Sequence, residues 1–159
     1  MERRKFLGLG VALFAASVVP ASLMAEDFRK SKPNAWTTKN PADKKGQSLD
    51  GVNAAIKELF GTDKVEVGNV KLKAPDIAEN GAVIPVTAKA DKATKIAIFQ
   101  SANPEALVAV FDVPKNGIPN YSMRIKMSQT GTVVAVAQID GKLYKAEKVV
   151  KVTIGGCGG

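Results

Sequence analysis

The chain has 159 residues, of which 45% are hydrophobic and 24% are charged, and its formal net charge at pH 7 is +8. This length and composition predict one globular domain with a sizeable core and exclude a chain that is disordered throughout. The sequence holds one cysteine and no histidine, which excludes an internal disulfide and removes both the usual general base and the commonest metal ligand.

The N-terminus has the order of an export signal. Basic residues at 3–5 precede an uncharged apolar run over 6–19, and small residues follow. The run is shorter than the roughly 20 residues that span a bilayer. We therefore expect residues 1–25 to be a signal peptide cleaved after Ala25, with Ala21 as an alternative site and an uncleaved anchor as the alternative interpretation. The Arg-Arg-Lys-Phe-Leu stretch resembles the twin-arginine motif, which implies export to the periplasm.

The next segment changes from loop to helix. Residues 26–47 are predicted to form a polar lead-in, in which Trp36 is the only large apolar anchor. Apolar residues at a spacing near 3.6 then predict one short helix over 48–60. Ser48 is its expected N-cap and Gly61 its expected stop.

The rest of the chain, up to residue 154, has the pattern of strands. Apolar and β-branched runs predict seven strands, over residues 65–72, 82–90, 95–100, 107–113, 121–128, 132–139 and 143–154. The Asn-Gly pair at 80–81 and the Asp-Gly pair at 140–141 predict hairpins, and Pro85 predicts a sheet edge or a bulge.

Strands at these short intervals predict an all-β fold. We expect an immunoglobulin-like antiparallel β-sandwich with one short N-terminal helix over residues 48–154, followed by a flexible C-terminal arm at 155–159. A β-barrel is the alternative architecture.

The chain ends with a cysteine among glycines, namely Gly155, Gly156, Cys157, Gly158 and Gly159. The glycines give the backbone wide freedom and remove every side chain that would shield the sulfur. The tail offers no base, metal ligand or second thiol that would activate Cys157. It therefore predicts a covalent attachment site that partner proteins act on, with no catalytic residue, no metal site and no cofactor.

Three other interpretations of Cys157 remain open at this point. The cysteine is incidental to a disordered end, or it links two chains of an exported structural or interaction protein by a disulfide, or it serves a metallochaperone or thiol redox enzyme. The last is disfavoured by the absence of histidine and of a Cys-x-x-Cys pair.

The net positive charge favours the binding of small anions and acidic partners, and the lack of an Arg-rich block disfavours nucleic-acid binding.

Several stretches resemble one family, the SoxY carriers of thiosulfate oxidation. The resemblance is carried by the ending Gly155–Gly159 and by the stretches Tyr121–Met127, Thr130–Val136, Asp140–Tyr144 and Val149–Ile154. The sequence motifs are similar over roughly residues 100–159, and the predicted architecture is similar over the whole mature chain.

The resemblance implies a carrier and not an enzyme. It implies a heterodimer with a SoxZ-like subunit, a SoxXA-like cytochrome that couples thiosulfate to Cys157, a SoxB-like hydrolase that releases sulfate and, in some organisms, a SoxCD-like dehydrogenase. Thiosulfate-derived sulfur species would be the cargo, and the mature form would have no membrane span. We expect docking charge from exposed basic side chains, with the candidates Arg124, Lys126, Lys142, Lys145, Lys148 and Lys151.

Overall fold

The computed structural model describes residues 26–154, so the predicted signal peptide and the predicted arm lie outside the described residues. The helical elements are α2 (Phe28–Ser31), α3 (Pro33–Thr37), the 3-10 turn η2 (Ala42–Lys44) and α4 (Asp50–Phe60). The strands are β1 (Val65–Val67), β2 (Lys71–Lys73), β3 (Ile77–Ala78), β4 (Ile84–Lys89), β5 (Lys95–Gln100), β6 (Leu107–Asp112), β7 (Asn120–Ile125), β8 (Gly131–Ile139) and β9 (Lys142–Val152).

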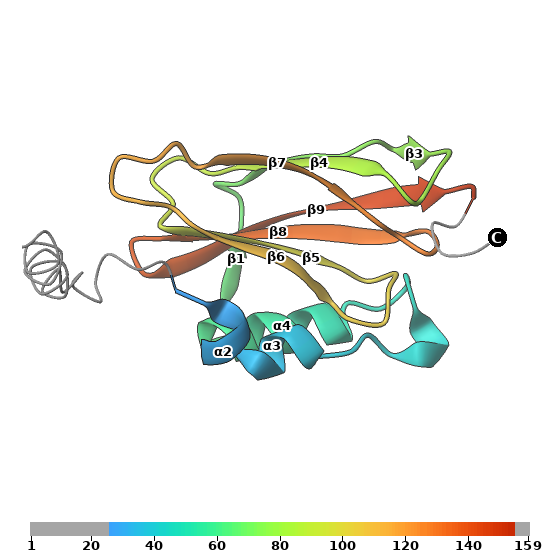
Figure 1. Ribbon diagram of the computed structural model, residues 1–159, viewed down its shortest axis with the longest axis horizontal. Coiled ribbons are helices and arrows are strands. Elements are labelled where there is room, and N and C mark those ends of the chain that lie inside the picture. Colours follow the sequence, from blue (N-terminus) through green and yellow to red (C-terminus); the bar gives the residue numbers. More distant parts are fainter. Residues whose placement is uncertain (1–25, 155–159) are drawn as a thin grey trace, which may run out of the picture.

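These elements form three layers, with two sheets face to face and the helices on the outer face of the larger sheet (Figure 1). The smaller sheet has the order β2-β4-β7, and the larger one has the order β1-β9-β8-β5-β6, with β3 added beside β9. The predicted immunoglobulin-like sandwich is confirmed, and the sheets do not close into a barrel. Two short pairings, β1 with β9 and β3 with β9, are parallel.

The core between the two sheets follows from strand alternation. In β4, Ile84, Val86 and Ala88 are buried while the intervening residues are more exposed. The same alternation places alternate apolar residues of β8 and β9 in this core, because successive side chains of a strand point to opposite faces.

A second core lies between the larger sheet and the helices. The apolar stripe of α4, formed by Val52, Ile56 and Leu59, packs against Phe99 of β5 and against alternate residues of β8. Burying each such aliphatic side chain contributes about 1.5–3 kcal/mol. Because β8 is covered on both faces, its central residues form an unbroken apolar run instead of an alternating one.

The predicted helix and the last hairpin are confirmed. The helix α4 begins at Asp50, so its N-cap is Leu49 and the predicted N-cap Ser48 is wrong by one residue, although the Ser48 hydroxyl accepts a hydrogen bond from the Asp50 N–H. It ends at Phe60 and is capped by the predicted stop, Gly61, which has a left-handed φ of 75°. At the last hairpin, Asp140 and Gly141 have φ angles of 50° and 76°, as a two-residue turn between strands of right-handed twist requires.

The strand prediction is wrong in detail, because the described residues form nine strands and not seven. The predicted strand over 65–72 is interrupted at Gly68 and Asn69, which have φ angles of 121° and 55°, and its two halves enter different sheets. The Asn-Gly pair at 80–81 does not close a hairpin, because β3 joins β9 of the larger sheet whereas β4 belongs to the smaller one.

The lead-in is more structured than its polar composition suggests. It forms the short helices α2 and α3, and Phe28 and Ala35 are buried in the core beneath the larger sheet. Trp36 packs against this core as predicted, but Phe28 is a second large anchor. Pro85 lies beyond the end of β2, where β4 has only β7 beside it, so the predicted local edge is confirmed. Within residues 26–154, no helix is long and apolar enough to cross a membrane.

Candidate functional site

The candidate attachment residue, Cys157, and the four glycines around it lie outside the described residues. The structure does describe the strand that leads to them. β9 ends at Val152, and the chain is described as far as Ile154, three residues before the cysteine. The candidate site is therefore built from the surroundings of residues 151–154, which we call the arm root.

Backbone hydrogen bonds hold the arm root on one side. The N–H of Lys151 donates to the Asp76 carbonyl at 2.9 Å, and the N–H of Thr153 donates to the Ala78 carbonyl at 3.1 Å. The Gly81 N–H then donates to the Ile154 carbonyl at 2.9 Å. The short strand β3 and the turn after it thus hold the chain to within one residue of Gly155.

A threonine hydroxyl holds the arm root on the other side. The ladder between β8 and β9 ends at the pair Gly131 and Val150. One step beyond it, the Thr130 hydroxyl accepts a hydrogen bond from the Val152 N–H at 3.0 Å. This side chain extends the pairing of β9 past the end of its neighbouring strand, so residues 151–154 are fixed from two directions.

We expect the substitution Thr130→Val to loosen the arm root. Valine has nearly the same shape but cannot accept the Val152 N–H, so unfolding stability should fall by about 1 kcal/mol. Hydrogen exchange measured by NMR should show faster exchange of the Val152 amide. The control is Thr87→Val, which removes a hydroxyl pair with Ser122 on the smaller sheet and should leave Val152 unchanged. Equal exchange in both variants would contradict the role given to Thr130.

The surface of the arm root is partly apolar. Ile154 and Ile77 are exposed at 65% and 59%. The exposed Lys151 lies directly opposite Ile77 in the parallel pairing. Close by in sequence, Lys148 forms an ion pair with Asp76 at 3.0 Å.

The basic residues expected to supply docking charge do not form one patch. Arg124 lies on β7 in the smaller sheet, and Lys126 follows that strand. Lys145 is paired with Glu147 at 3.1 Å. Lys142 begins β9, at the opposite end of the strand from the arm root. Of the six candidates, Lys148 and Lys151 are therefore those that β9 itself places beside the arm root.

The carboxyl group of Asp112 has a shifted pKa, and it lies away from the arm root. Burial raises the pKa of Asp112 above its ordinary value, the nearby Lys95 ammonium opposes this, and Glu26 adds to it. Asp112 faces Lys95 across β5 and β6, at the end of the sheet where the Asp140 turn also lies. The Lys95 ammonium lies 3.7 Å from Glu26 and 4.3 Å from the centre of the Phe28 ring. This cluster ties the start of the described chain to the sheet.

The sequence pattern did not predict the residues that hold the arm root. Thr130, Gly81 and β3 are brought to β9 by the tertiary fold, and no spacing rule links them to Cys157. The Asn-Gly pair at 80–81 correctly predicted a turn, but this turn connects strands of different sheets instead of closing a hairpin.

A comparison with protein families matches the sulfur oxidation protein SoxY over residues 56–157. Among solved structures, the sulfur carrier protein SoxY from Chlorobium limicola f thiosulfatophilum is 42% identical, with a TM-score of 0.59, over 67% of this chain and 100% of that one. A superoxide reductase (neelaredoxin) from Ignicoccus hospitalis is 14% identical, with a TM-score of 0.51, over 57% of this chain and 96% of that one; this likeness concerns the fold alone. A comparison with curated proteins finds no match. The family match over most of the chain and the identity to a solved SoxY show that this chain belongs to the SoxY family of sulfur oxidation proteins.

Proposed function

We propose that this chain is exported to the periplasm and carries thiosulfate-derived sulfur covalently on Cys157. The observation that carries the proposal is its membership in the SoxY family, with a matched region that extends to residue 157. The composition supports the same conclusion, because Cys157 is the only cysteine and four glycines flank it.

The arm root is consistent with a carrier function, because it defines the point from which the proposed arm would move. Hydrogen bonds hold the chain up to Ile154, and glycine, the most permissive residue, follows at 155 and 156. Three residues beyond Ile154 give the sulfur a reach of about 10 Å from the domain. A sulfur atom presented in this way can enter an active site that would not admit a whole domain, and its tether keeps the intermediate from diffusing away.

The proposed chemistry takes place on the sulfur, and partner enzymes supply the reactants. The thiolate and thiosulfate lose two electrons to an oxidising SoxXA-like cytochrome, and a new S–S bond forms to give a cysteine S-thiosulfonate. Water, activated by a SoxB-like hydrolase, then cleaves the bond between the outer sulfur and the sulfonate, which leaves as sulfate. The cysteine persulfide that remains is a substrate for a SoxCD-like dehydrogenase where one is present. In this scheme the chain acts as a substrate and not as an enzyme, and a SoxZ-like subunit completes the carrier.

Intact mass spectrometry of the protein exported by cells growing on thiosulfate tests the proposal. We expect mass increases equal to a thiosulfonate or a persulfide, with complete loss of these species in Cys157→Ser. The same spectra report whether the mature chain begins at Glu26. The control is Ser128→Ala, which leaves the tail unchanged and should retain the adducts.

The alternative is an exported structural protein joined by a disulfide at Cys157. It predicts a dimer that reductant separates, no small adduct, and normal thiosulfate consumption by cells that carry Cys157→Ser. That combination of results would exclude the carrier function.

A further inference from the structure

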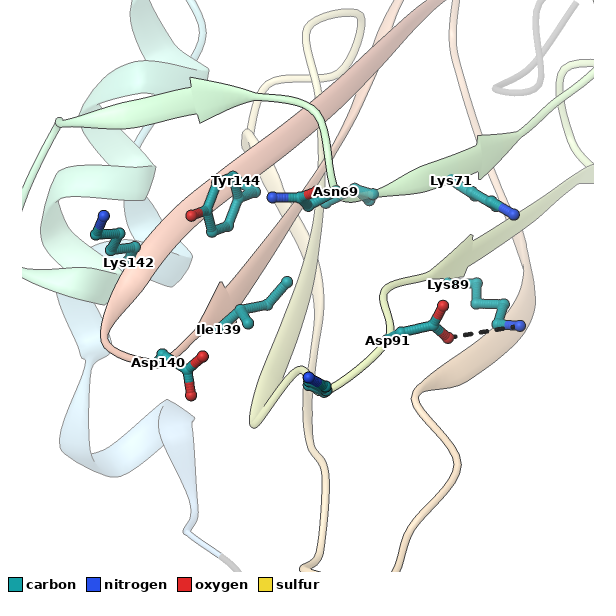
Figure 2. Close-up of a pocket in the computed structure, with 10 residues that line it drawn as sticks. Asn69, Lys71, Lys89, Asp91, Ile139, Asp140, Lys142 and Tyr144 are labelled. Atoms are coloured by element: carbon teal, nitrogen blue, oxygen red, sulfur yellow. Dashed lines mark ion pairs between the residues drawn. The ribbon is translucent and has the colours of Figure 1, made fainter.

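A cleft of about 770 Å³ opens at the end of the sandwich away from the arm root. Three segments that are distant in sequence meet there: the start of β2 with the residues before it, the residues that follow β4, and the turn between β8 and β9 (Figure 2). Val70, Ile139 and Tyr144 supply its apolar lining. Its volume is within the range of ligand-binding clefts, about 300–1,000 Å³.

The charge in this cleft is mostly positive. Lys71, Lys89, Lys92 and Lys142 line it, against the carboxylates of Asp91 and Asp140. Among residues 26–154, the ion pair within the cleft joins Lys89 to Asp91 at 3.6 Å. Lys71 and Lys89 are direct partners in the antiparallel pairing of β2 and β4, and like charges directly opposite one another destabilise a sheet.

Three residues of this cleft have left-handed backbone angles, and for Lys92 that conformation is unfavourable. Asn69, Lys92 and Asp140 have φ angles of 55°, 63° and 50°, and they are the non-glycine residues with positive φ in the described part of the chain. All three line the cleft. Asparagine and aspartate tolerate this conformation, but lysine does so at a cost. The like-charge pair of Lys71 and Lys89 and the backbone angle of Lys92 therefore place two unfavourable features in one cleft, as is typical of binding sites.

The arrangement of the lysines favours an extended ligand over a single small ion. Lys71 and Lys89 project to one side of the cleft together with Asp91, whereas Lys142 and Asp140 lie on the other side, with Tyr144 and Ile139 nearer to them (Figure 2). One tetrahedral anion would not reach both sides. A segment with acidic residues at its two ends and an apolar residue between them would match the ammonium groups on the two sides and the apolar lining.

The cleft lies far from the arm root. Lys142 and Tyr144 are at the start of β9, and Ile154 follows its end. At about 3.3 Å per residue, the two places are roughly 33–40 Å apart along the strand. A protein seated in the cleft therefore leaves the arm free for other enzymes, a consequence that rests on the proposed carrier function.

We propose that this cleft is a docking site for an acidic, extended segment of a partner protein, one that remains bound while the arm is in use. The partner is recognised by carboxylates spaced around an apolar side chain. The cleft itself needs neither Cys157 nor its cargo for this interaction.

The peptide Glu-Glu-Leu-Glu-Glu, with blocked ends, serves as the probe in an NMR titration of the full mature chain. We expect amide shifts in the segments 69–71, 89–92 and 139–144, and none at the arm root. The variant Lys71→Glu should weaken binding on the order of tenfold, because it reverses one charge and neutralises its neighbour. It should also raise the thermal midpoint of unfolding, since it removes the like-charge pair with Lys89.

The control Lys126→Glu makes the same change of charge beyond the end of β7, on an exposed side chain, and should leave binding unchanged. Equal weakening in both variants would reduce the effect to net charge and overturn the proposal. Shifts produced equally well by sodium sulfate at matched ionic strength would replace it with a small-anion site. The titration should give the same result in Cys157→Ser protein, so its failure and the failure of the carrier function are separate results.

Discussion

The substitution Phe99→Ala is expected to destabilise the domain more than any other single truncation on the helix side of the larger sheet. Phe99 is fully buried on β5, where it packs with the apolar stripe of α4. Replacing a buried phenylalanine by alanine removes its transfer free energy and leaves a cavity, at a cost of about 3–5 kcal/mol. That is a large part of the roughly 5–15 kcal/mol that stabilises a typical domain.

Urea unfolding followed by circular dichroism measures this loss. The matched control is Phe60→Ala, because Phe60 belongs to the same core but is only half-buried at the end of α4. It should cost clearly less than Phe99→Ala. If the two variants unfold at the same urea concentration, the contact between Phe99 and α4 does not stabilise the domain as its burial indicates.

The substitution Gly51→Ala should also destabilise the protein, although alanine normally stabilises a helix relative to glycine by about 0.5–1 kcal/mol. A Cβ atom on Gly51 would lie 2.6 Å from the Asn40 Cα and from the Lys39 carbonyl oxygen. These are backbone atoms that cannot rotate away. The Asn40 side chain donates to the carbonyls of Gln100 and Asn103, so the segment cannot easily move. Overpacking of this kind costs about 1–3 kcal/mol.

The control for Gly51→Ala is Asn53→Ala, on the exposed face of the same helix. We expect it to be neutral or slightly stabilising, because it improves helix propensity without adding a contact. Opposite signs of the two changes in thermal midpoint would confirm that close approach of the lead-in, and not helix propensity, selects glycine at position 51. A gain in stability for both variants would contradict the geometry.

The arm root and the proposed docking cleft lie at opposite ends of β9. β9 begins beside the lysine-lined cleft and ends at the arm root. Because β9 lies between β1 and β8 and pairs with β3 near its end, it is among the most constrained elements of the larger sheet. A change that loosens its end, such as Thr130→Val, should therefore affect the arm and leave the cleft unchanged.

Local features of the sequence were enough to predict several parts of this protein. The spacing of apolar residues predicted α4, and Gly61 marked its end. The Asp-Gly pair predicted the turn between β8 and β9, because only a few residue types adopt positive φ easily. The strand alternation predicted a sandwich. The isolation of Cys157 among glycines predicted a passive attachment site, which stays a prediction.

Only the tertiary structure decided which strands pair and which surfaces form. A run of apolar residues shows that a strand is buried but not what lies beside it, so residues 65–72 looked like one strand although they serve two sheets. The polar lead-in folds because the Phe28 side chain is buried against the larger sheet. This contact is between residues distant in sequence, so no local pattern predicts it. The lysine-lined cleft exists because three distant segments meet. Strand pairing and clefts depend on contacts across the whole chain, whereas turns and helix ends depend on neighbouring residues.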